Sequence, residues 1–401
     1  MIHPRHFAFL AVLTATPAMA QENDGFPMTF RGQVMVDAGY VAQGRNPAGS
    51  DYNSGANIRR AQVNLSGDLG GGWSYSLGGV FASRGSQSGT RLNGFIEYQN
   101  KNSLGFRAGV FSAPSGMGGN TNAVSELMLE RPSAVSIARG TAASPSRITF
   151  SGFSQGPRHL VALSVTGGSV ASGGRYDNQQ AVVGRAAWLA VHDGDWRWVL
   201  DGAVSHVFRL ADTAGPNSGI VRLRDGPEMA LDITRPLDTD VLDARSLTSW
   251  NLESGATWRN AYLQGGYFHY HVARRIAVPD PGFQGWYVQG SWILTGEGRS
   301  YNAETANFRP PVPSSPLTAG GWGAFELTAR FSGVDLNFNE MAGPGAVRGG
   351  RQEVFAAGLN WYQTSRVRFS LVYDHYRIAH PEAPANDFSG DGLVLRAQYA
   401  M

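Results

Sequence analysis

Two kinds of side chain alternate along residues 196–209, and this pattern constrains the fold more than any other feature of the chain. One parity is mostly apolar, with aromatic residues at both ends: Trp196, Trp198, Leu200, Gly202, Val204, His206 and Phe208. The other mixes charged and small residues: Arg197, Val199, Asp201, Ala203, Ser205, Val207 and Arg209. Alternate side chains of a β-strand point to opposite faces, so the segment predicts a strand with one apolar and one mostly polar face.

The length of this segment indicates where such a strand would lie. Strands of soluble sheets are usually about 5–6 residues long, whereas a tilted strand that crosses a bilayer needs roughly 9–11 residues. The segment therefore favours the membrane. The same alternation recurs at 30–40, 60–66, 73–81, 104–110, 250–258, 286–294, 325–332, 355–361, 367–373 and 393–399.

The connections between these segments differ in length. Short polar joins lie at 70–72, 100–103, 193–195 and 363–365, and longer irregular stretches lie at 43–56, 113–146, 211–245, 302–320 and 341–350. Short turns at one end and long loops at the other are typical of porin-type barrels, whose strand number is even. Because an open sheet would leave unpaired edges in lipid, we expect one all-β, transmembrane, antiparallel β-barrel of about 16 strands.

Aromatic residues near the strand ends agree with this expectation. We expect Trp196, Trp250, Trp258, Trp286, Trp292 and Trp361 to form the interfacial girdles of the barrel. The alternative is that they fill the core of a soluble β-sandwich. The length of the strands favours the barrel, as does a secretion signal at residues 1–20.

The first 20 residues have the features of a signal peptide. Arg5 and His6 form a weakly basic start, residues 7–12 are apolar, and Ala18-Met19-Ala20 fits the small-x-small cleavage pattern. We expect residues 1–20 to be removed and residues 21–401 to form a single barrel domain in the outer membrane.

The charge composition narrows the partners and cofactors. The formal net charge is +2 and there is no cysteine, which argues against wholesale nucleic-acid binding and leaves no disulfide framework or thiolate metal site. Of the 33 basic residues, only Lys101 is a lysine. A high-GC genome would explain this bias without selection. Anion binding would also explain the excess of arginine over lysine, because a guanidinium has a fixed charge and a planar fork that suits phosphate-like anions.

Several short motifs, taken in their order along the chain, resemble the phosphate-selective porin O/P family. They are Arg59-Arg60-Ala61, Gly67 with Trp73-Ser74-Tyr75, segment 92–98, segment 109–111, Glu130-Arg131, Arg222-Leu223-Arg224 with Pro227-Glu228, segment 285–301, segment 322–332 and segment 358–362. The resemblance covers the chain from about Phe30 onward. It implies a homotrimer of such barrels in the outer-membrane bilayer, each with its third long loop, here 113–146, folded inward as a constriction.

The resemblance also implies an arginine-lined path for small anions. By position, Arg59 and Arg60 match the constriction, Arg222 and Arg224 match the approach to it, and Arg31 has the lumenal parity of the first strand. The constriction loop contributes Thr121, Asn122, Glu130 and Arg131. Fixed positive charges in a narrow tube of low dielectric concentrate anions, and adjacent sites let an ion leave as easily as it enters.

Two positions depart from the family pattern. The family carries a lysine in the inward loop where this chain has Val124, and an aspartate in the fourth strand where this chain has Asn93. Replacing one positive and one negative residue leaves the net local charge unchanged. It removes the pair of charged side chains that would distinguish phosphate from other anions.

We expect a passive, cofactor-free channel for small anions, with phosphate or polyphosphate implied as the solute by the resemblance. The alternatives are a general or organic-acid porin, a plugged surface barrel, and a barrel lipid hydrolase built on His159 or His206 with a nearby serine.

Glu126 and Glu130 are expected to be counter-charges that accept from Arg131 or Arg139. His269 and His271 share a face but lack a third ligand in reach, so we expect belt packing near Tyr267 and no metal.

Overall fold

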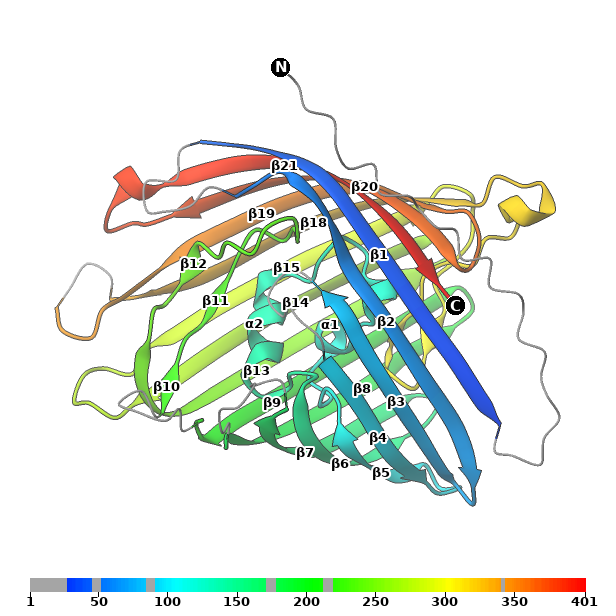
Figure 1. Ribbon diagram of the computed structural model, residues 1–401, viewed down its shortest axis with the longest axis horizontal. Helices are drawn as coiled ribbons and strands as arrows, with labels where there is room; N and C mark the ends of the chain where they lie inside the picture. The colour runs from blue at the N-terminus through cyan, green and yellow to red at the C-terminus, as the bar shows by residue number, and fades with distance from the viewer. Residues whose placement is uncertain (1–26, 45–51, 84–90, 171–177, 212–218, 340–342) are drawn as a thin grey trace.

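Sixteen long antiparallel strands close into a barrel in which each strand pairs with its neighbour along the chain. The computed structural model describes residues 27–44, 52–83, 91–170, 178–211, 219–339 and 343–401. The predicted signal peptide lies outside these residues. The strands of the wall are tilted (Figure 1), and the first and last strands pair from Gln33↔Ala400 to Gln43↔Gly390, which closes the sheet.

The wall strands are β1 (Met28–Gln43), β2 (Gly55–Gly70), β3 (Trp73–Ser83), β4 (Arg91–Gln99), β5 (Leu104–Val110), β6 (Arg147–Gln155), β7 (His159–Ser169), β8 (Gln180–Asp193), β9 (Trp196–Arg209), β13 (Leu242–Trp258), β14 (Ala261–Arg274), β15 (Gly282–Ile293), β18 (Ala324–Phe338), β19 (Val347–Tyr362), β20 (Val367–Ala379) and β21 (Phe388–Ala400). The short elements of the connections are α1 (Met117–Asn120), η1 (Ala123–Ser125), α2 (Ser133–Ala142), β10 (Ile220–Val221), β11 (Arg224–Asp225), β12 (Leu237–Asp238), β16 (Tyr301–Asn302), β17 (Asn307–Phe308), η2 (Leu317–Ala319) and η3 (Pro384–Asn386).

The predicted alternation of side chains is confirmed in the wall. On β9, Leu200 and Val204 are exposed on the outer face, and Asp201 and Ser205 are buried inside the barrel. The other wall strands from β6 to β21 show the same pattern of exposed apolar and buried polar positions. Apolar side chains therefore coat the surface that faces lipid. The inward face carries polar side chains together with apolar clusters that pack against the inward loops.

Tryptophans pair with other aromatic residues across neighbouring strands on the outer surface. The rings of Trp196 and Trp258 stack with centroids 5.8 Å apart, and those of Phe325 and Trp361 are 5.9 Å apart. These pairs lie where strands meet the short turns, as expected for an interfacial girdle. Among the described residues, no helix is long and apolar enough to cross a bilayer.

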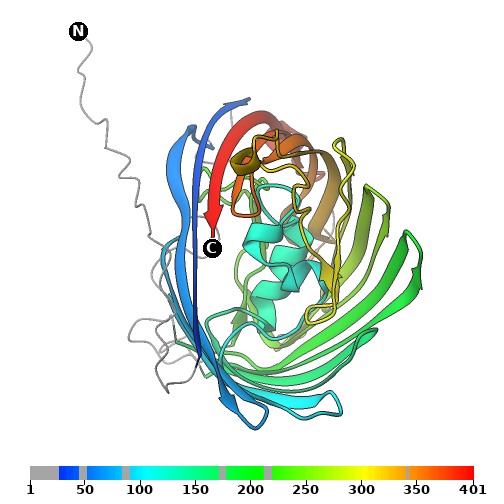
Figure 2. The same ribbon diagram turned by 90° about the vertical axis from the view of Figure 1, so that its right-hand side faces the viewer.

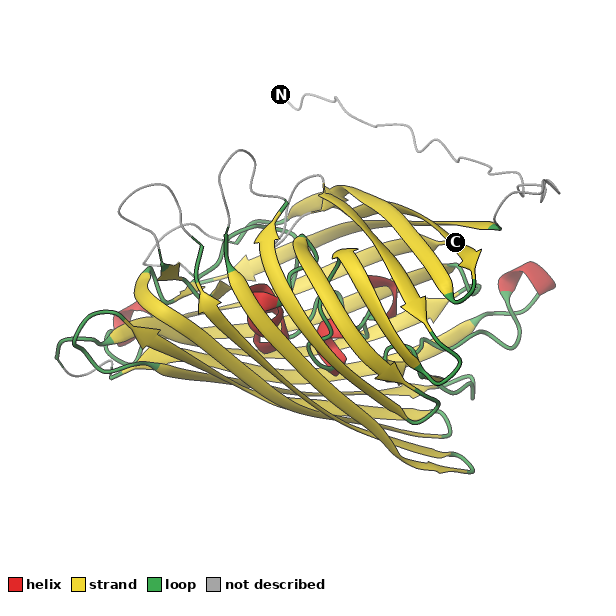
Figure 3. Ribbon diagram, turned by 90° about the horizontal axis from the view of Figure 1, so that it is seen from below, coloured by secondary structure: helices red, strands yellow, loops and turns green. Residues whose placement is uncertain are grey.

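Three long connections fold into the barrel. The loop after β5 brings in α1 and α2, which the wall strands enclose (Figures 2 and 3). The described part of the loop after β9 lies inside next to it, since Ser133 of α2 donates its backbone N–H to Glu228 over 2.7 Å. The prediction that segment 113–146 folds inward is confirmed.

The third inward connection, residues 294–323, enters from the other end. Asn307 in it donates to the backbone oxygen of Met117 over 3.0 Å and to the hydroxyl of Thr121 over 2.5 Å. Because strand directions alternate, the connection from β15 to β18 lies at the same end as the short β13–β14 turn, where Figure 1 also shows the C-terminus. A strict division into short turns at one end and long loops at the other is therefore wrong for this connection.

Helix α2 is attached to one side of the lumen. Its Ala134, Val135 and Ile137 are buried against β9, β13, β14, β15 and β18 in a cluster that includes Phe268 and Tyr287. The hydroxyl of Tyr270 donates to the backbone oxygen of Ala134 over 2.5 Å. The opposite face of the helix carries Ser136 and Arg139, which are half-buried, and Gly140, which is exposed. This face is turned away from the wall that holds the helix.

Candidate functional site

A β-bulge in β2 places two neighbouring arginines on the lumenal face. In the β1–β2 register Met35 pairs with Arg60 and Val36 pairs with Ile58, so Arg59 has no opposite residue. An extra residue in one strand shifts its alternation by one position. Asn57 and Arg59 therefore face inward before the bulge, and Arg60 and Gln62 face inward after it. Without the bulge, strict alternation would send Arg59 toward lipid.

The inward loop is fixed to this wall through Glu130. Its carboxylate accepts two hydrogen bonds from the guanidinium of Arg59, one of them over 2.5 Å, and lies 3.3 Å from Arg396. Arg396 is itself held by Asp37 through two bonds of 2.7 Å and donates to the backbone oxygen of Leu129 over 2.6 Å. Such bidentate, charge-assisted pairs set both position and orientation. The predicted constriction residues Arg59 and Glu130 are therefore in direct contact.

The charge of Glu130 gives this contact a defined pH range. Burial alone would raise its pKa, but Arg59, Arg396 and Arg60 outweigh burial and lower the pKa to about 2. A carboxylate with a lowered pKa stabilises the folded state above its ordinary pKa, and this stabilisation is lost as pH falls toward the lowered value.

We expect the inward loop to stay attached from neutral pH down to about pH 4 and to loosen as pH approaches about 2. Open-channel current noise in a planar bilayer, recorded while pH is lowered, measures this. Glu130→Gln should be noisy already at neutral pH, because Arg59 then loses its charged partner. Equal noise in the wild type and the variant at neutral pH would contradict the assignment.

The second loop arginine, Arg131, holds the inward loop together. It lies 3.0 Å from the carboxylate of Glu126 and donates to the backbone oxygens of Gly118 (3.2 Å) and Thr121. Burial raises the pKa of Glu126, and Arg131 opposes that effect. Glu126 is therefore the ion-pair partner of Arg131, although no described residue donates a hydrogen bond to its Oε1. Glu130 accepts from Arg59 and Arg396 instead.

Five arginines and two glutamates make up what we call the constriction cluster: Arg59, Arg60, Arg91, Arg131 and Arg139, with Glu126 and Glu130. Arg60 feels the charges of Arg59, Arg131, Glu130 and Arg91, and Arg139 feels those of Arg131, Arg60, Arg91 and Glu126. Counted over the described residues of this cluster alone, five positive and two negative charges leave three positive charges. Two strands of the wall, β2 and β4, and the inward loop contribute to it.

Sequence reasoning missed the roles of Arg91 and Arg139 in this cluster. Arg91 begins β4, one residue before a motif that was used for the family resemblance. Arg139 lies on α2, whose apolar positions 134, 135, 137, 138 and 142 have helical spacing. That spacing could have predicted a short helix with Arg139 on its polar side.

Many other lumenal arginines are engaged with carboxylates of the barrel. The buried pairs are Arg185 with Asp201 (2.6 Å), Arg299 with Glu326 (2.8 Å) and Arg330 with Glu228 (2.6 Å). Arg107 pairs with Glu97 and lies over the ring of Phe95, 4.3 Å from its centroid. Each of these four arginines is therefore neutralised locally by a carboxylate of its own.

Arg222 and Arg224 lie in the loop after β9 and not on the wall. The guanidinium of Arg222 is exposed and bonded to Asp238 over 2.5–3.0 Å, with Asp240 at 3.7 Å. Arg224 is exposed on β11. Both border a cavity of about 320 Å³ beside α2. The structure thus separates them from Arg59 and Arg60 and gives Arg222 acidic partners.

Arg31 faces the lumen nearer the short-turn end. It is paired in register with Asn64 and borders a cavity of about 1030 Å³ that Arg107 and Arg185 also line. Thr121 and Asn122 border a different cavity of about 430 Å³, beside segment 302–312. These three predicted residues are therefore close to the path through the barrel but outside the constriction cluster.

The two positions that depart from the family pattern lie in different places. Val124 borders the cavity beside segment 302–312, and its backbone oxygen accepts from Gln398 over 3.3 Å. Asn93 shares the lumenal parity of β4 with Arg91. Only the second position therefore adjoins the constriction cluster.

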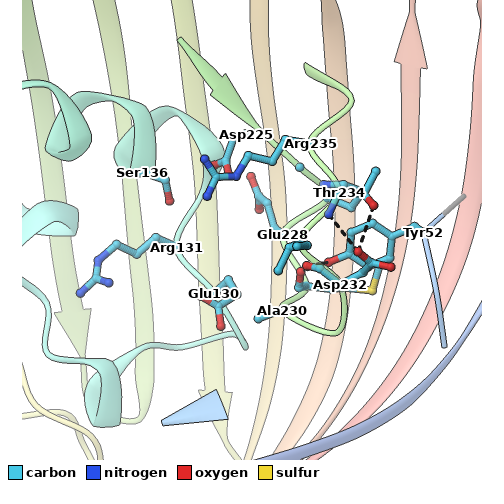
Figure 4. A pocket seen from close by; sticks show the side chains of 14 residues that line it. Tyr52, Glu130, Arg131, Ser136, Asp225, Glu228, Ala230, Asp232, Thr234 and Arg235 are labelled. Carbon is cyan, nitrogen blue, oxygen red and sulfur yellow. Dashed lines mark hydrogen bonds between the residues drawn. The ribbon is translucent and has the colours of Figure 1, made fainter. Parts of the chain in front are cut away.

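The inward loop and the loop after β9 meet at a small, charged seam. Figure 4 shows Arg131 and Glu130 on one side and Asp225, Glu228 and Arg235 on the other, around a cavity of about 40 Å³. Burial and the neighbouring Glu228 raise the pKa of Asp225 to about 7, against the effect of Arg235. The cavity has room for a few water molecules only, so it is too small for a solute to pass. It marks the place where the two loops are in contact.

The structure gives the contacts of three histidines that the sequence singles out, His159, His206 and His269. His159 lies 3.0 Å from the hydroxyl of Ser154, but a catalytic base needs a third group that orients it, and within the described ranges nothing bonds its other ring nitrogen. His206 bonds Thr248 over 2.8 Å. His269 stacks on Trp250 at 5.7 Å. The described part of the chain holds no cluster of three metal-ligating side chains.

A closed barrel with an apolar outer belt and a lumen narrowed by inward loops defines a protein of the outer-membrane porin class. The chain matches the phosphate-selective porin O and P family over residues 29–401. It therefore belongs to that family and to the outer membrane.

Curated relatives match over part of their length. An uncharacterised protein of Caulobacter vibrioides is 30% identical over 155 residues, which are 38% of this chain and 29% of that protein. Porin O of Pseudomonas aeruginosa is 27% identical over 158 residues, 37% of this chain and 34% of that protein. The matched region thus spans about a third of each relative.

Solved structures share the fold at low identity. OmpT of Vibrio cholerae has a TM-score of 0.56 at 11% identity, covering 95% of this chain and 99% of that one. The channel DcaP of Acinetobacter baumannii has a TM-score of 0.56 at 9% identity, covering 94% and 98%. These similarities support the barrel architecture.

Proposed function

We propose that the protein is a passive channel for small anions whose selectivity is set by the constriction cluster. The observation that carries this proposal is the surplus of three positive charges where β2, β4 and the inward loop approach one another. Fixed charge in a narrow, low-dielectric passage concentrates counter-ions and excludes ions of like sign. Arg60 is central to the proposal, because Arg59 is already bonded to Glu130.

Arg222, Arg224 and Arg31 have supporting roles in this proposal. Arg222 and Arg224 border a cavity beside α2 at the long-loop end, and Arg31 borders the large cavity toward the short turns. An anion would meet them before and after the constriction cluster. Because Asp238 and Asp240 adjoin Arg222, we assign this approach less selectivity than the cluster.

Phosphate or polyphosphate is the proposed solute, on the strength of the family. Val124 and Asn93 replace charged residues of the family pattern, so a porin for organic acids or other small metabolites is the alternative within the class. Both solute classes are compatible with the same surplus of positive charge.

Insertion of the purified protein into a planar bilayer tests the proposal. Discrete current steps in KCl support an open channel, and an absence of steps would favour a plugged barrel. Inorganic phosphate is then added to the open channel. Block of the chloride current at millimolar phosphate supports a phosphate site, whereas an unchanged current contradicts phosphate as the solute and leaves the channel itself standing.

We also propose that the native assembly is a homotrimer, as the family resemblance implies. The mass of the detergent-solubilised protein should equal that of three chains once bound detergent is subtracted. A mass of one chain would contradict this.

A further inference from the structure

The inward helix α2 carries an arginine, Arg139, on the face that is turned away from the wall. The apolar face of α2 is buried against β9, β13, β14, β15 and β18, and Tyr270 bonds the backbone of the helix. The other face is turned away from this wall, and the loop after β9 borders part of it at Ser136 and Gly140. Arg139 lies on this face, together with Ser136 and Gly140.

Among the described residues, no carboxylate lies within bonding distance of the guanidinium of Arg139. In the part of the chain that the structure describes, no ion pair or side-chain hydrogen bond joins it to another residue, and its Nε is buried without a hydrogen-bond partner. The Nε of Arg60, across the passage, is also buried without a partner. A buried donor that no protein group satisfies is costly, and a bound ligand can satisfy it.

Like charges surround Arg139. Burial and the charges of Arg131, Arg60 and Arg91 hold its pKa well below the usual range, and only Glu126 opposes them. Glu126 is already engaged with Arg131 at 3.0 Å. An anion placed between α2 and β2 would relieve this crowding at several guanidinium groups at once.

The loop lysine of the family pattern is replaced by Val124, which borders another cavity. The constriction nevertheless keeps a cation on the inward loop, because Arg139 lies on α2 of the same loop. A guanidinium presents several donors in one plane and suits an oxyanion better than a point charge does.

We propose that Arg139 is the loop-borne, specificity-determining cation of the channel, binding a doubly charged oxyanion jointly with Arg60 of the wall. This inference rests on the proposed function. Arg91 and Arg131 add to the local field, and chloride, with one charge and no fixed geometry, gains less from the arrangement. The site therefore favours oxyanions such as phosphate or sulfate over halides.

The test is the block of chloride current by inorganic phosphate or sulfate in a planar bilayer. We expect Arg139→Gln to raise the half-blocking concentration roughly tenfold or more, since it removes bonds to a charged group. Arg139→Lys keeps the charge but loses the planar fork, so its half-blocking concentration should lie between those of the wild type and Arg139→Gln. The matched control Arg259→Gln alters an exposed arginine at the β13–β14 turn and should stay within about twofold of the wild type.

The outcomes separate this inference from the proposed function. A half-blocking concentration for Arg139→Gln within twofold of the wild type overturns the role of Arg139. An anion-selective wild type that neither phosphate nor sulfate blocks also overturns it, but leaves the anion channel intact. Cation selectivity of the wild type overturns both. Heat-modifiable migration on a gel shows that each variant is folded, and Arg139→Lys decides the matter if Arg139→Gln does not fold.

Discussion

Arg60→Glu is expected to shift the channel from anion preference toward cation preference. The substitution changes the charge of the constriction cluster by two, from a surplus of three to a surplus of one, and the charge change acts on an anion that is still approaching the cluster. At an effective dielectric constant of about 20 and a distance of about 12 Å, one charge contributes roughly 1.4 kcal/mol. Two charges therefore lower the entry of anions by about a hundredfold.

Comparison with Arg59 makes this prediction specific. Arg59 is next to Arg60 in sequence, and the bulge places both inside the barrel, but Glu130 holds Arg59 through two hydrogen bonds. Arg59→Gln should therefore change the noise of the channel more than its selectivity. Reversal potentials in a KCl gradient measure selectivity, with Arg259→Glu as the control for an added surface charge. An anion preference of Arg60→Glu equal to that of the wild type would remove Arg60 from the pathway.

Glu326→Ala is expected to destabilise the barrel by about 3–5 kcal/mol, because it leaves a buried arginine without its counter-charge. Both Glu326 and Arg299 are buried, and two hydrogen bonds of 2.8 and 2.9 Å join them. Glu326 also accepts from Ser291 and Tyr362, each over 2.7 Å. This network fixes the start of the 294–323 connection, so its loss should also loosen the contact between Asn307 and the inward loop.

Urea unfolding in detergent, followed by tryptophan fluorescence, measures the effect. Asp195→Ala is the matched control, since the ion pair of Asp195 with Arg259 is 3.0 Å long but exposed on both sides. Exposed pairs contribute up to about 1 kcal/mol. If the two variants lose similar stability, the pair of Arg299 and Glu326 is not the anchor of the connection.

The wall of the barrel could be predicted from the sequence because lipid and water select opposite side chains at successive positions. On β9 the prediction holds residue by residue, from Leu200 outside to Asp201 inside. The placement of both Arg59 and Arg60 at the constriction came from the family resemblance. Strict alternation could not explain it, because the bulge that turns both inward depends on the register of β2 against β1.

The course of the connections could not be predicted from alternation. Segment 294–323 enters the lumen from the short-turn end because of strand parity, and its contacts with α1 are made by residues distant in sequence, such as Asn307 and Met117. Arg222 has acidic partners on the far strand of its loop hairpin, at Asp238 and beyond. The sequence named Arg139 only as a donor to the loop glutamates, and its place on a helix was missed because a single helix of ten residues gives only a weak periodic signal.

The reversal potential of the wild-type channel in a KCl gradient shows whether the constriction cluster selects anions. For a tenfold gradient at neutral pH, we expect a potential with the sign of chloride selectivity, approaching about 59 mV, because the described residues of the cluster carry three surplus positive charges. A potential with the sign of potassium selectivity would mean that the constriction cluster does not select anions.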